Sequence, residues 1–589
     1  MERRVFIAII LSFLVLYMYQ ALFVRPAPAP SARQAATATP ARPAGPATGT
    51  GTGSITDPNT QPAPPAPAAA PEPQALVSEP SEREITIDTA TVQAALTNRG
   101  GRLVHWRLKE YRDNRGQPVD LVASDLPPGE PLPFALRVDD DQTTARMNNA
   151  LYRVSGDAGS HVDATHGPRT VSFEYQDAAG IHIRKDFRFD PRNYIVVFSA
   201  TATAGDRALN PTIAWGPGLG DIAPAAPSGG FFSPSSILPP EAIYHRDGKI
   251  ERVAITKLTD QPVLDGQFRF AGIDDLYFMA ALVNPGQARL EYRPVAIPGP
   301  ANTQRQLIAQ AVRFPQPPMN VRFFVGPKQF DLLRSIDTEL VRAVNFGIFG
   351  WLAVPLLGAL KWIHGFAGNW GWSIILLTVL INIVIFPLRH KSVVSMRRMQ
   401  ALQPQLKVIQ DRYANLKVTD PGRQKMNTEV MNLYREKGVN PASGCIPILL
   451  TMPVLLAFYA LLGQAIELRG AQFGWWIRDL SLADPYYVLP ILVTITMVWQ
   501  QKLTPAASMD PTQQKVMMFM PVMFGFIFLN TASGTVLYWF VSNLWAIGQQ
   551  YFTNWLIGPP VVQAAARPAA ERRLKTAGAG RTAGAEKHS

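Results

Sequence analysis

Five long apolar runs, none containing a charged residue, occupy the last third of the chain between residues 369 and 557. A helix needs about 20 predominantly apolar residues to cross the hydrocarbon core of a bilayer, so runs of this kind predict membrane spans. The last two runs form one uncharged stretch, which is too long for a single span and contains turn residues at 530–534. The predicted spans are about 371–388, 442–463, 485–500, 516–529 and 535–557.

A further apolar run, residues 5–24, follows Arg3 and Arg4 at the N-terminus. We predict that residues 1–25 form a signal-anchor span whose basic N-terminus lies in the cytoplasm. A cleaved signal peptide is the alternative, but the apolar part is long for one and Arg25 begins a poor cleavage context. Residues 26–81 are rich in Pro and Ala and too poor in large apolar residues to fold, which predicts a disordered linker.

The positive charge of the chain is concentrated beside the apolar runs. Residues 389–437 contain eleven Lys or Arg against four Asp or Glu, and the tail, residues 558–589, is also basic. Because basic loops stay on the cytoplasmic side, six spans with both termini in the cytoplasm satisfy every loop. The formal charge of +12 is therefore interpreted as membrane topology, and no direct contact with nucleic acid is predicted.

Apolar residues recur at helical spacing within the basic segment 389–438, on both sides of Asp420 and Pro421. Asp followed by Pro starts a helix and Gly438 ends one, so we predict a cytoplasmic hairpin of two helices. Its Met-rich stripe is either the seam between the helices or an adaptable surface for apolar clients. The candidate hairpin residues are Arg389, Lys391, Met396, Arg397, Arg398 and Met399.

Alternation of apolar and polar residues distinguishes residues 82–326. Val171, Phe173 and Tyr175 alternate with polar neighbours, and the same pattern resumes after a turn-like gap at 177–180. This pattern predicts antiparallel strands in a large β-sandwich, which the orientation of the anchor places in the periplasm. Its five histidines show no metal-ligand spacing, so no metal site is predicted.

Residues 327–368 are apolar but interrupted by charges grouped at one end and by tryptophans. They predict an amphipathic helix lying in the outer interface of the membrane, with a spanning helix as the alternative. The whole chain is therefore predicted to be a polytopic α-helical membrane protein with an all-β periplasmic domain.

The predicted spans lack the groups that intramembrane chemistry requires. They contain no ionisable residue to couple transport to an ion gradient, and no His or Lys to activate a nucleophile. The single cysteine, Cys445, excludes an internal disulfide and a multi-cysteine metal site. We therefore predict no catalysis, no metal and no cofactor.

Neutral polar side chains do occur in the spans and at their outer turn. Singly, each is explained by hydrogen bonds between helices, but the set together favours a partly hydrated groove. The candidate groove residues are Thr378, Asn382, Thr451, Asn530, Ser533, Tyr538 and Ser542.

Short motifs in residues 330–557 resemble those of the YidC-type membrane protein insertases (the YidC/Oxa/Alb family). The motifs are Asn369-Trp370-Gly371, Phe386-Pro387-Leu388, Leu402-Gln403-Pro404, Val439-Asn440-Pro441 with Gly444-Cys445, Asp484-Pro485-Tyr486-Tyr487, and Ser542-Asn543-Leu544. The anchor, linker and β-domain resemble the Gram-negative branch of this family. The resemblance implies a periplasmic β-supersandwich and an insertase core at 369–557 whose hydrophilic groove opens to cytoplasm and lipid.

The same resemblance implies an activity and partners. Members of the family insert inner-membrane proteins and help them fold as chaperones, alone or with the Sec translocon and its accessory subunits, and they receive chains from the ribosome. They are not enzymes. Many members carry a cation at the position that Asn382 occupies here, so this groove is predicted to be uncharged and to act through hydration. A transporter or channel with a solute-capturing β-domain, and an anchored envelope enzyme, are the alternatives.

Overall fold

The computed structural model describes residues 73–113, 115–156, 159–220, 240–258, 263–298, 304–413, 422–439, 446–503 and 511–557. The predicted anchor, most of the linker, the basic tail, Cys445 and the Asp420-Pro421 pair lie outside these residues. The chain divides into two compact units. One is built of strands from residues up to 326, and the other contains the helices from Pro327 onward.

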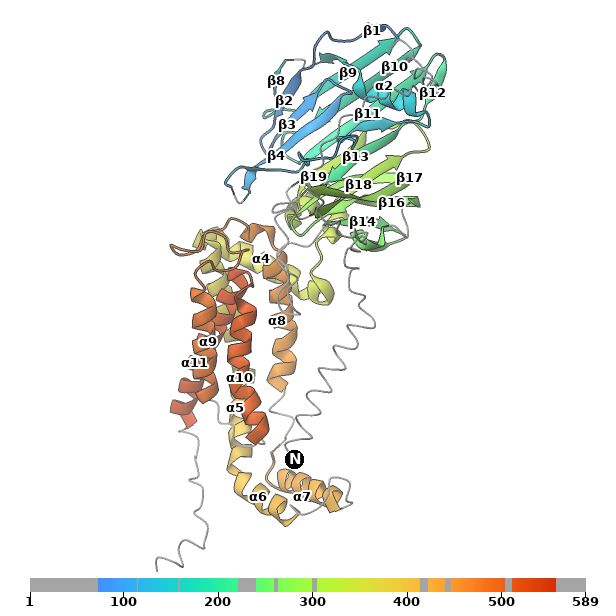
Figure 1. The fold of residues 1–589 in the computed structure, drawn as a ribbon. Helices are drawn as coiled ribbons and strands as arrows, with labels where there is room; N and C mark the ends of the chain where they lie inside the picture. Colours follow the sequence, from blue (N-terminus) through green and yellow to red (C-terminus); the bar gives the residue numbers. More distant parts are fainter. Residues whose placement is uncertain are drawn as a thin grey trace, which may run out of the picture. The chain divides into compact units, whose positions relative to one another are not determined.

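The first unit, which we call the β unit, contains a 14-stranded sheet and a 5-stranded sheet (Figure 1). The larger sheet comprises β1 (Ala75–Val77), β6 (Ala135–Arg137), β7 (Arg153–Gly156), β9 (Arg169–Asp177), β10 (Ile181–Phe189), β11 (Ile195–Ala204), β12 (Arg207–Leu209), β13 (Thr212–Gly218), β14 (Glu241–Arg246), β15 (Lys249–Ala254), β16 (Val263–Asp274), β17 (Phe278–Pro298), β18 (Gln304–Arg313) and β19 (Val321–Pro327). The smaller sheet comprises β2 (Glu84–Asp88), β3 (Val92–Thr97), β4 (Arg102–Arg112), β5 (Pro118–Asp120) and β8 (His161–Asp163). The described part of the unit also contains two short helices, α2 (Asp141–Asn149) and the 3₁₀ helix η1 (Ile255–Lys257).

The alternating pattern in the sequence gives the expected antiparallel pairs. Strands β9 and β10 pair in register from His182–Gln176 to Phe189–Arg169, and their apolar residues point into the core. The predicted turn at 177–180 is closed by the Asp177 carboxylate, which accepts a hydrogen bond from the backbone N–H of Ile181 at 3.0 Å. The prediction of a strand-rich domain is therefore confirmed.

Aromatic side chains fill the interior of the β unit. Phe134 lies within ring-contact distance of Phe187, Phe198, Trp215 and Phe323. Offset and edge-to-face contacts of this kind add to the stabilisation that comes from burying the rings. In addition, the indole N–H of Trp106 on β4 donates a 2.8 Å hydrogen bond to the carbonyl of Val325 on β19, which ties the smaller sheet to the larger one.

One cation lies inside this core. The Lys185 side chain is fully buried, and burial holds the pKa of its ammonium well below the ordinary value. The ammonium donates to the carbonyls of Gly100, Gly101 and Phe134 at 2.7, 3.2 and 2.8 Å. Three carbonyl acceptors offset part of the cost of burying the charge, so the lysine joins strand β10 to two separate loops.

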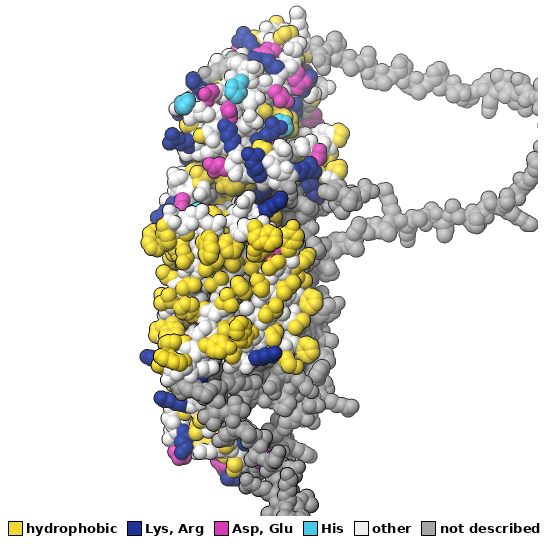
Figure 2. Space-filling view, turned by 90° about the vertical axis from the view of Figure 1, so that its left-hand side faces the viewer, with side chains coloured by type: hydrophobic (Ala, Val, Ile, Leu, Met, Phe, Trp, Pro, Cys, Tyr) yellow, Lys and Arg dark blue, Asp and Glu magenta, His cyan; other side chains and the backbone are white. Residues whose placement is uncertain are grey.

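The second unit, which we call the helical unit, contains the apolar helices. Its elements are α3 (Phe330–Ile336), η3 (Leu340–Ala343), η4 (Gly347–Phe349), α4 (Gly350–Ala367), α5 (Trp370–Ala401), α6 (Gln403–Arg412), α7 (Gly422–Glu436), α8 (Ile446–Gln464), η6 (Ile466–Leu468), α9 (Val488–Leu503), α10 (Pro511–Phe528) and α11 (Ser533–Ile557). Among the residues that the structure describes, two stretches, Gly347–Ala367 and Trp370–Met399, are long and apolar enough to cross a membrane by length and composition. Hydrophobic side chains cover the face of this unit that Figure 2 shows.

The helix that starts the core is longer than the sequence predicts. The expected span 371–388 is only the first part of α5, which continues through Pro387 to Ala401. The sequence pattern changes from apolar to basic at Arg389, and this change predicts the end of a span at Leu388. Proline removes one backbone donor and bends a helix, but packing of the flanking turns can maintain the helix. The helix α5 therefore continues past Pro387 although the side chains change from apolar to basic there.

The segment before the core is also divided differently. Instead of one amphipathic helix over 327–368, the structure has α3, two 3₁₀ turns and α4. Gly347, the first residue of the second 3₁₀ turn, has a φ of 66°, a left-handed conformation that interrupts a regular helix. Trp351 and Trp362 of α4 are exposed, which agrees with an interfacial or lipid-facing position for this helix.

Helix α11 packs against α5 and α9, and α10 packs against α9 (Figure 1). Helix α4 packs against α5 and α8. The start of α5 depends on a close approach: a Cβ atom at Gly371 would overlap the ring of Phe473 in the loop after α8. The glycine therefore fixes the position of the helix that carries the polar residues described below.

We expect Gly371→Leu to destabilise the helical unit by about 1–3 kcal/mol, the usual cost of overpacking. Gly463→Leu in α8 is the matched control, because a Cβ atom there meets no heavy atom within 4 Å. Thermal unfolding in detergent, followed by tryptophan fluorescence, measures both variants. Equal unfolding temperatures for the two variants would contradict the close approach at Gly371.

Candidate functional site: a polar chamber in the helical unit

A cavity of about 230 Å³ lies among helices α5, α8, α9 and α11. Apolar side chains such as Val454 and Leu455 of α8 form one wall, while the other helices contribute polar groups. We call this cavity the polar chamber. Its polar lining residues are Asn382, Arg389, Gln500, Tyr538, Ser542 and Asn543.

Helix α5 brings Asn382 and Arg389 to the same wall of the chamber. Seven residues make almost two full turns, so the two side chains share one helical face. The Nη1 atom of Arg389 donates a 3.2 Å hydrogen bond to Oδ1 of Asn382. The amide nitrogen of Asn382 donates in turn to the carbonyl of Thr378 at 2.8 Å, so the amide is held in place at both ends.

The prediction of an uncharged groove is therefore wrong. The sequence places Arg389 in the cytoplasmic hairpin, because it is the first charged residue after an apolar run. Since α5 continues as a helix beyond this point, Arg389 stays on the chamber face. Long helical side chains lean toward the N-terminus of their helix, and this brings the guanidinium back to Asn382.

Helices α9 and α11 complete the polar wall. Tyr538 and Ser542 are one turn apart on α11, and the ring of Tyr538 lies 4.6 Å from that of Phe458 on α8. One residue further, the amide of Asn543 donates to the hydroxyl of Thr496 on α9 at 3.4 Å. Gln500 and Asn543 were not among our candidate residues. Both are amides within uncharged apolar runs, and this feature of the sequence could have identified them as groove candidates.

The remaining predicted groove residues lie elsewhere. Thr378 is buried, and its hydroxyl donates to the carbonyl of Ile374 in its own helix at 2.6 Å. The Ser533 hydroxyl donates to the carbonyl of Leu482 at 2.7 Å, which fastens the start of α11. Asn530 is exposed at the turn between α10 and α11, and the side chain of Thr451 lies outside the described residues. Of the seven candidates, Asn382, Tyr538 and Ser542 line the chamber.

The candidate hairpin residues form the last turns of α5 and do not belong to a separate helix. Lys391 and Arg398 are exposed there, and Met399 is half-buried. Arg397 contacts the side chain of Asn554 on α11. The side chain of Met396 lies outside the described residues. The hairpin consists of α6 and α7, joined by a 2.7 Å hydrogen bond from the Tyr413 hydroxyl to the Glu429 carboxylate.

A second hollow between α5 and α11 is apolar. It encloses about 590 Å³ and is lined by residues such as Ile383, Leu544 and Phe552. Gln549 shares a helical face with Tyr538 and Ser542 but lines this hollow and not the chamber. One face of α11 is thus divided between two environments, the polar chamber and the apolar hollow.

The chain combines apolar helices that surround a polar chamber with a separate strand-rich unit. These features define a helical membrane protein that carries an additional β-domain. A family model described as 60Kd inner membrane protein matches residues 362–558, and another described as YidC periplasmic domain matches residues 84–359. Together they cover both units. The chain belongs to the YidC family of membrane protein insertases, whose members are not enzymes.

Relatives of similar length support this assignment. The membrane protein insertase YidC of Geobacter metallireducens is 35% identical over 574 residues, covering 94% of this chain and 98% of that protein. The protein of the same name from Syntrophus aciditrophicus is 34% identical over 490 residues, covering 80% and 85%. A solved structure titled "Active YidC insertase crystal structure with the first transmembrane domain resolved" matches with 17% identity and a TM-score of 0.35, covering 82% of this chain and 95% of that one. The family models and the insertase relatives give no support to a transporter or an anchored enzyme.

The chamber predicts a pattern of chemical accessibility. In a Cys445→Ser background we expect Ala546→Cys, which lines the chamber, to react with a water-soluble maleimide in permeabilised vesicles. Leu537→Cys, nine residues earlier on α11 and buried in the apolar core, should remain unlabelled. Mass spectrometry of the intact protein measures both. Labelling of the two positions at the same rate would rule out a hydrated chamber.

Proposed function

We propose that this chain inserts membrane proteins by receiving the hydrophilic segment of a nascent client in the polar chamber. The observation that carries this proposal is the cluster of amides, hydroxyls and one guanidinium within an otherwise apolar helical bundle. Such a cluster is costly in a membrane and is typically retained there for function.

The chamber lowers the barrier to moving polar groups into the bilayer. Each unsatisfied polar group in hydrocarbon costs several kcal/mol, so a hydrated pocket shortens the apolar distance that a client segment must cross. The hydrogen-bonding groups of Tyr538, Ser542 and Asn543 can replace water at the segment while it passes.

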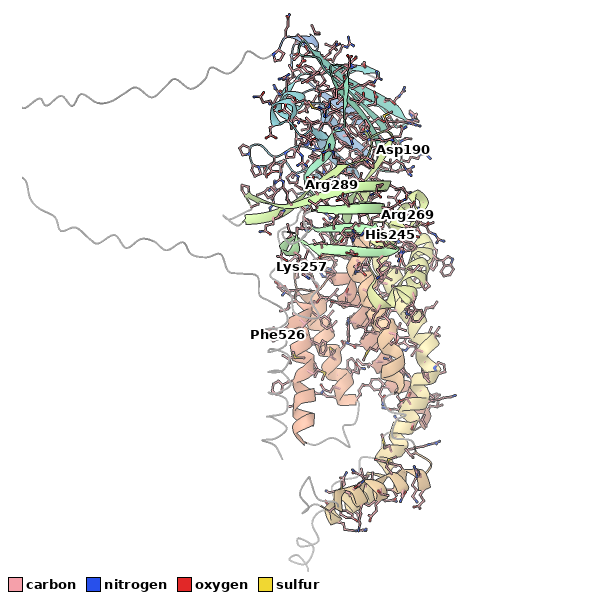
Figure 3. All side chains as sticks on the ribbon, turned by 90° about the vertical axis from the view of Figure 1, so that its right-hand side faces the viewer. Asp190, His245, Lys257, Arg269, Arg289 and Phe526 are labelled. Atoms are coloured by element: carbon pink, nitrogen blue, oxygen red, sulfur yellow. The ribbon has the colours of Figure 1, made fainter. Side chains whose placement is uncertain are left out.

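The apolar part of the client then leaves toward lipid. Helix α10 presents large exposed apolar side chains, among them Met518, Met523 and Phe526. Phe526, labelled in Figure 3, is 68% exposed on this helix. Methionine adapts its shape to varied partners, so this surface suits client helices of different sequence. Burial of the client's own side chains in lipid drives the final step.

The topology and partners follow from the distribution of charge. We place the protein in the cell inner membrane with six spans, both termini in the cytoplasm and the β unit in the periplasm. The basic hairpin of α6 and α7 then lies where chains emerge from the ribosome. The protein acts alone or beside the Sec translocon as an insertase and chaperone.

Depleting the protein should abolish protease protection of a small single-span client, and expression of the intact chain should restore it.

Among variants, we expect Ser542→Leu to lower insertion roughly tenfold, because it removes a hydrogen-bonding group worth about 1–3 kcal/mol and fills the chamber. Val541→Leu, which lines the apolar hollow on the same helix, is the matched control. Unchanged insertion of the client after depletion would refute the proposed function. Equal insertion activity of Ser542→Leu and Val541→Leu would show that the chamber does not take part in insertion.

Replacing residues 403–437 by a short Gly-Ser linker should reduce crosslinking of ribosome-bound client while leaving the protein in the membrane. The reason is that the basic hairpin α6–α7 is removed and helix α5 is kept whole to Ala401. Photocrosslinking with a stalled nascent chain measures delivery, and membrane fractionation is the control. Client crosslinking at the level of the intact protein would show that the hairpin does not receive clients.

A further inference from the structure

We infer that Asn382 is a positioning residue, which holds the Arg389 guanidinium inside the chamber so that the chamber is selective for anionic groups. Arg389 is thereby the charge-bearing residue of the chamber. Selection of acidic client segments by the chamber rests on the proposed function. The positive potential of the chamber does not depend on that function.

The hydrogen bonds around Asn382 support a tether. Its Oδ1 atom accepts from Arg389 at 3.2 Å, and its Nδ2 atom donates to the Thr378 carbonyl at 2.8 Å. The second bond fixes the amide so that its oxygen is directed to the guanidinium. Asn382 is 7% exposed, which leaves little of its amide for binding water. Its role is therefore better explained by the bond to Arg389 than by hydration.

The charge of Arg389 is not neutralised within the described part of the chain. No carboxylate there lies within ion-pair distance of its guanidinium, and the other polar groups lining the chamber are amides and hydroxyls. An unpaired cation in a low-dielectric wall produces a strong local potential. Anions are the ligands that such a site favours, and in a polypeptide these are the carboxylates of Asp and Glu.

The tether matters because arginine has an alternative position. A long cationic side chain near the end of an apolar helix tends to extend toward water at the membrane interface. Arg389 follows Leu388, the last residue of the apolar part of α5, so its charged group can leave the chamber along the helix. The bond to Asn382, about 10 Å nearer to the start of the helix, pulls the guanidinium in the opposite direction.

The electrostatic potential of the chamber can be measured with charged thiol reagents. In the Cys445→Ser, Ala546→Cys protein, the chamber thiol is treated with an anionic and with a cationic methanethiosulfonate of similar size in permeabilised vesicles. The ratio of the two rates reports the sign of the local potential. A neutral methanethiosulfonate reports whether the chamber is still open in each variant.

We expect the ratio to favour the anionic reagent, and Arg389→Gln to reduce it by about fivefold or more, as removal of one partly desolvated charge predicts. Asn382→Leu should reduce it nearly as much although the arginine remains. Asn382→Gln keeps the amide and should retain most of the ratio. The double variant Asn382→Arg, Arg389→Gln should restore it, because the charge is then built into the wall directly.

Two results would overturn the inference. A ratio that Arg389→Gln leaves unchanged would show that the guanidinium does not act in the chamber. If the ratio of anionic to cationic rates falls in Arg389→Gln but not in Asn382→Leu, Asn382 does not position the guanidinium and only packs in the wall. The neutral reagent excludes collapse of the chamber as the cause of either result.

Client insertion separates this inference from the proposed function. We expect Arg389→Gln to slow a client with an acidic translocated segment more than the same client with Gln in place of its Asp and Glu. If the thiol ratios behave as expected but no client is inserted through the protein, the proposed function fails and the electrostatic assignment stands. If both clients insert equally well while the thiol ratios change, the chamber's charge does not select clients.

Discussion

The helical unit depends on one constraint: hydrocarbon offers no hydrogen-bond partner, so a polar group in an apolar bundle must be satisfied by the protein or by water in a cavity. Thr378 and Ser533 meet it by donating to backbone carbonyls, and Asn543 meets it across the interface between α9 and α11. Where several polar groups face a shared cavity, a chamber results. The chamber is therefore the place where the bundle leaves room for polar groups from another chain.

The continuous helix α5 determines the character of that chamber. If α5 ended at the first basic residue, Arg389 would belong to a cytoplasmic loop and the chamber would be neutral. Because the helix continues to Ala401, the guanidinium lies two turns from Asn382 and on the same face. Asn382 contributes an amide to the chamber, and the charge enters from Arg389, another residue of the same helix.

The β unit shows how far a sequence pattern can predict structure. Alternation in β9 and β10 predicted both strands and their turn, because side chains on successive residues of a strand point to opposite faces. The same pattern does not predict the partners of distant strands, such as β11 with β19, or the hydrogen bond from Trp106 to Val325. Those contacts join segments more than a hundred residues apart, and no local rule specifies them.

The sequence by itself determined the classes of segment, the absence of charge within the apolar runs and the family to which the chain is similar. It also identified Asn382, Tyr538 and Ser542 as polar residues of one site, because buried polarity in apolar runs is visible without coordinates. Only the tertiary structure decided that Thr378 and Ser533 are satisfied elsewhere and that Arg389 belongs to the chamber. The physical reason is that composition reports how a residue interacts with solvent, whereas its partner depends on helix packing and on the reach of a flexible side chain.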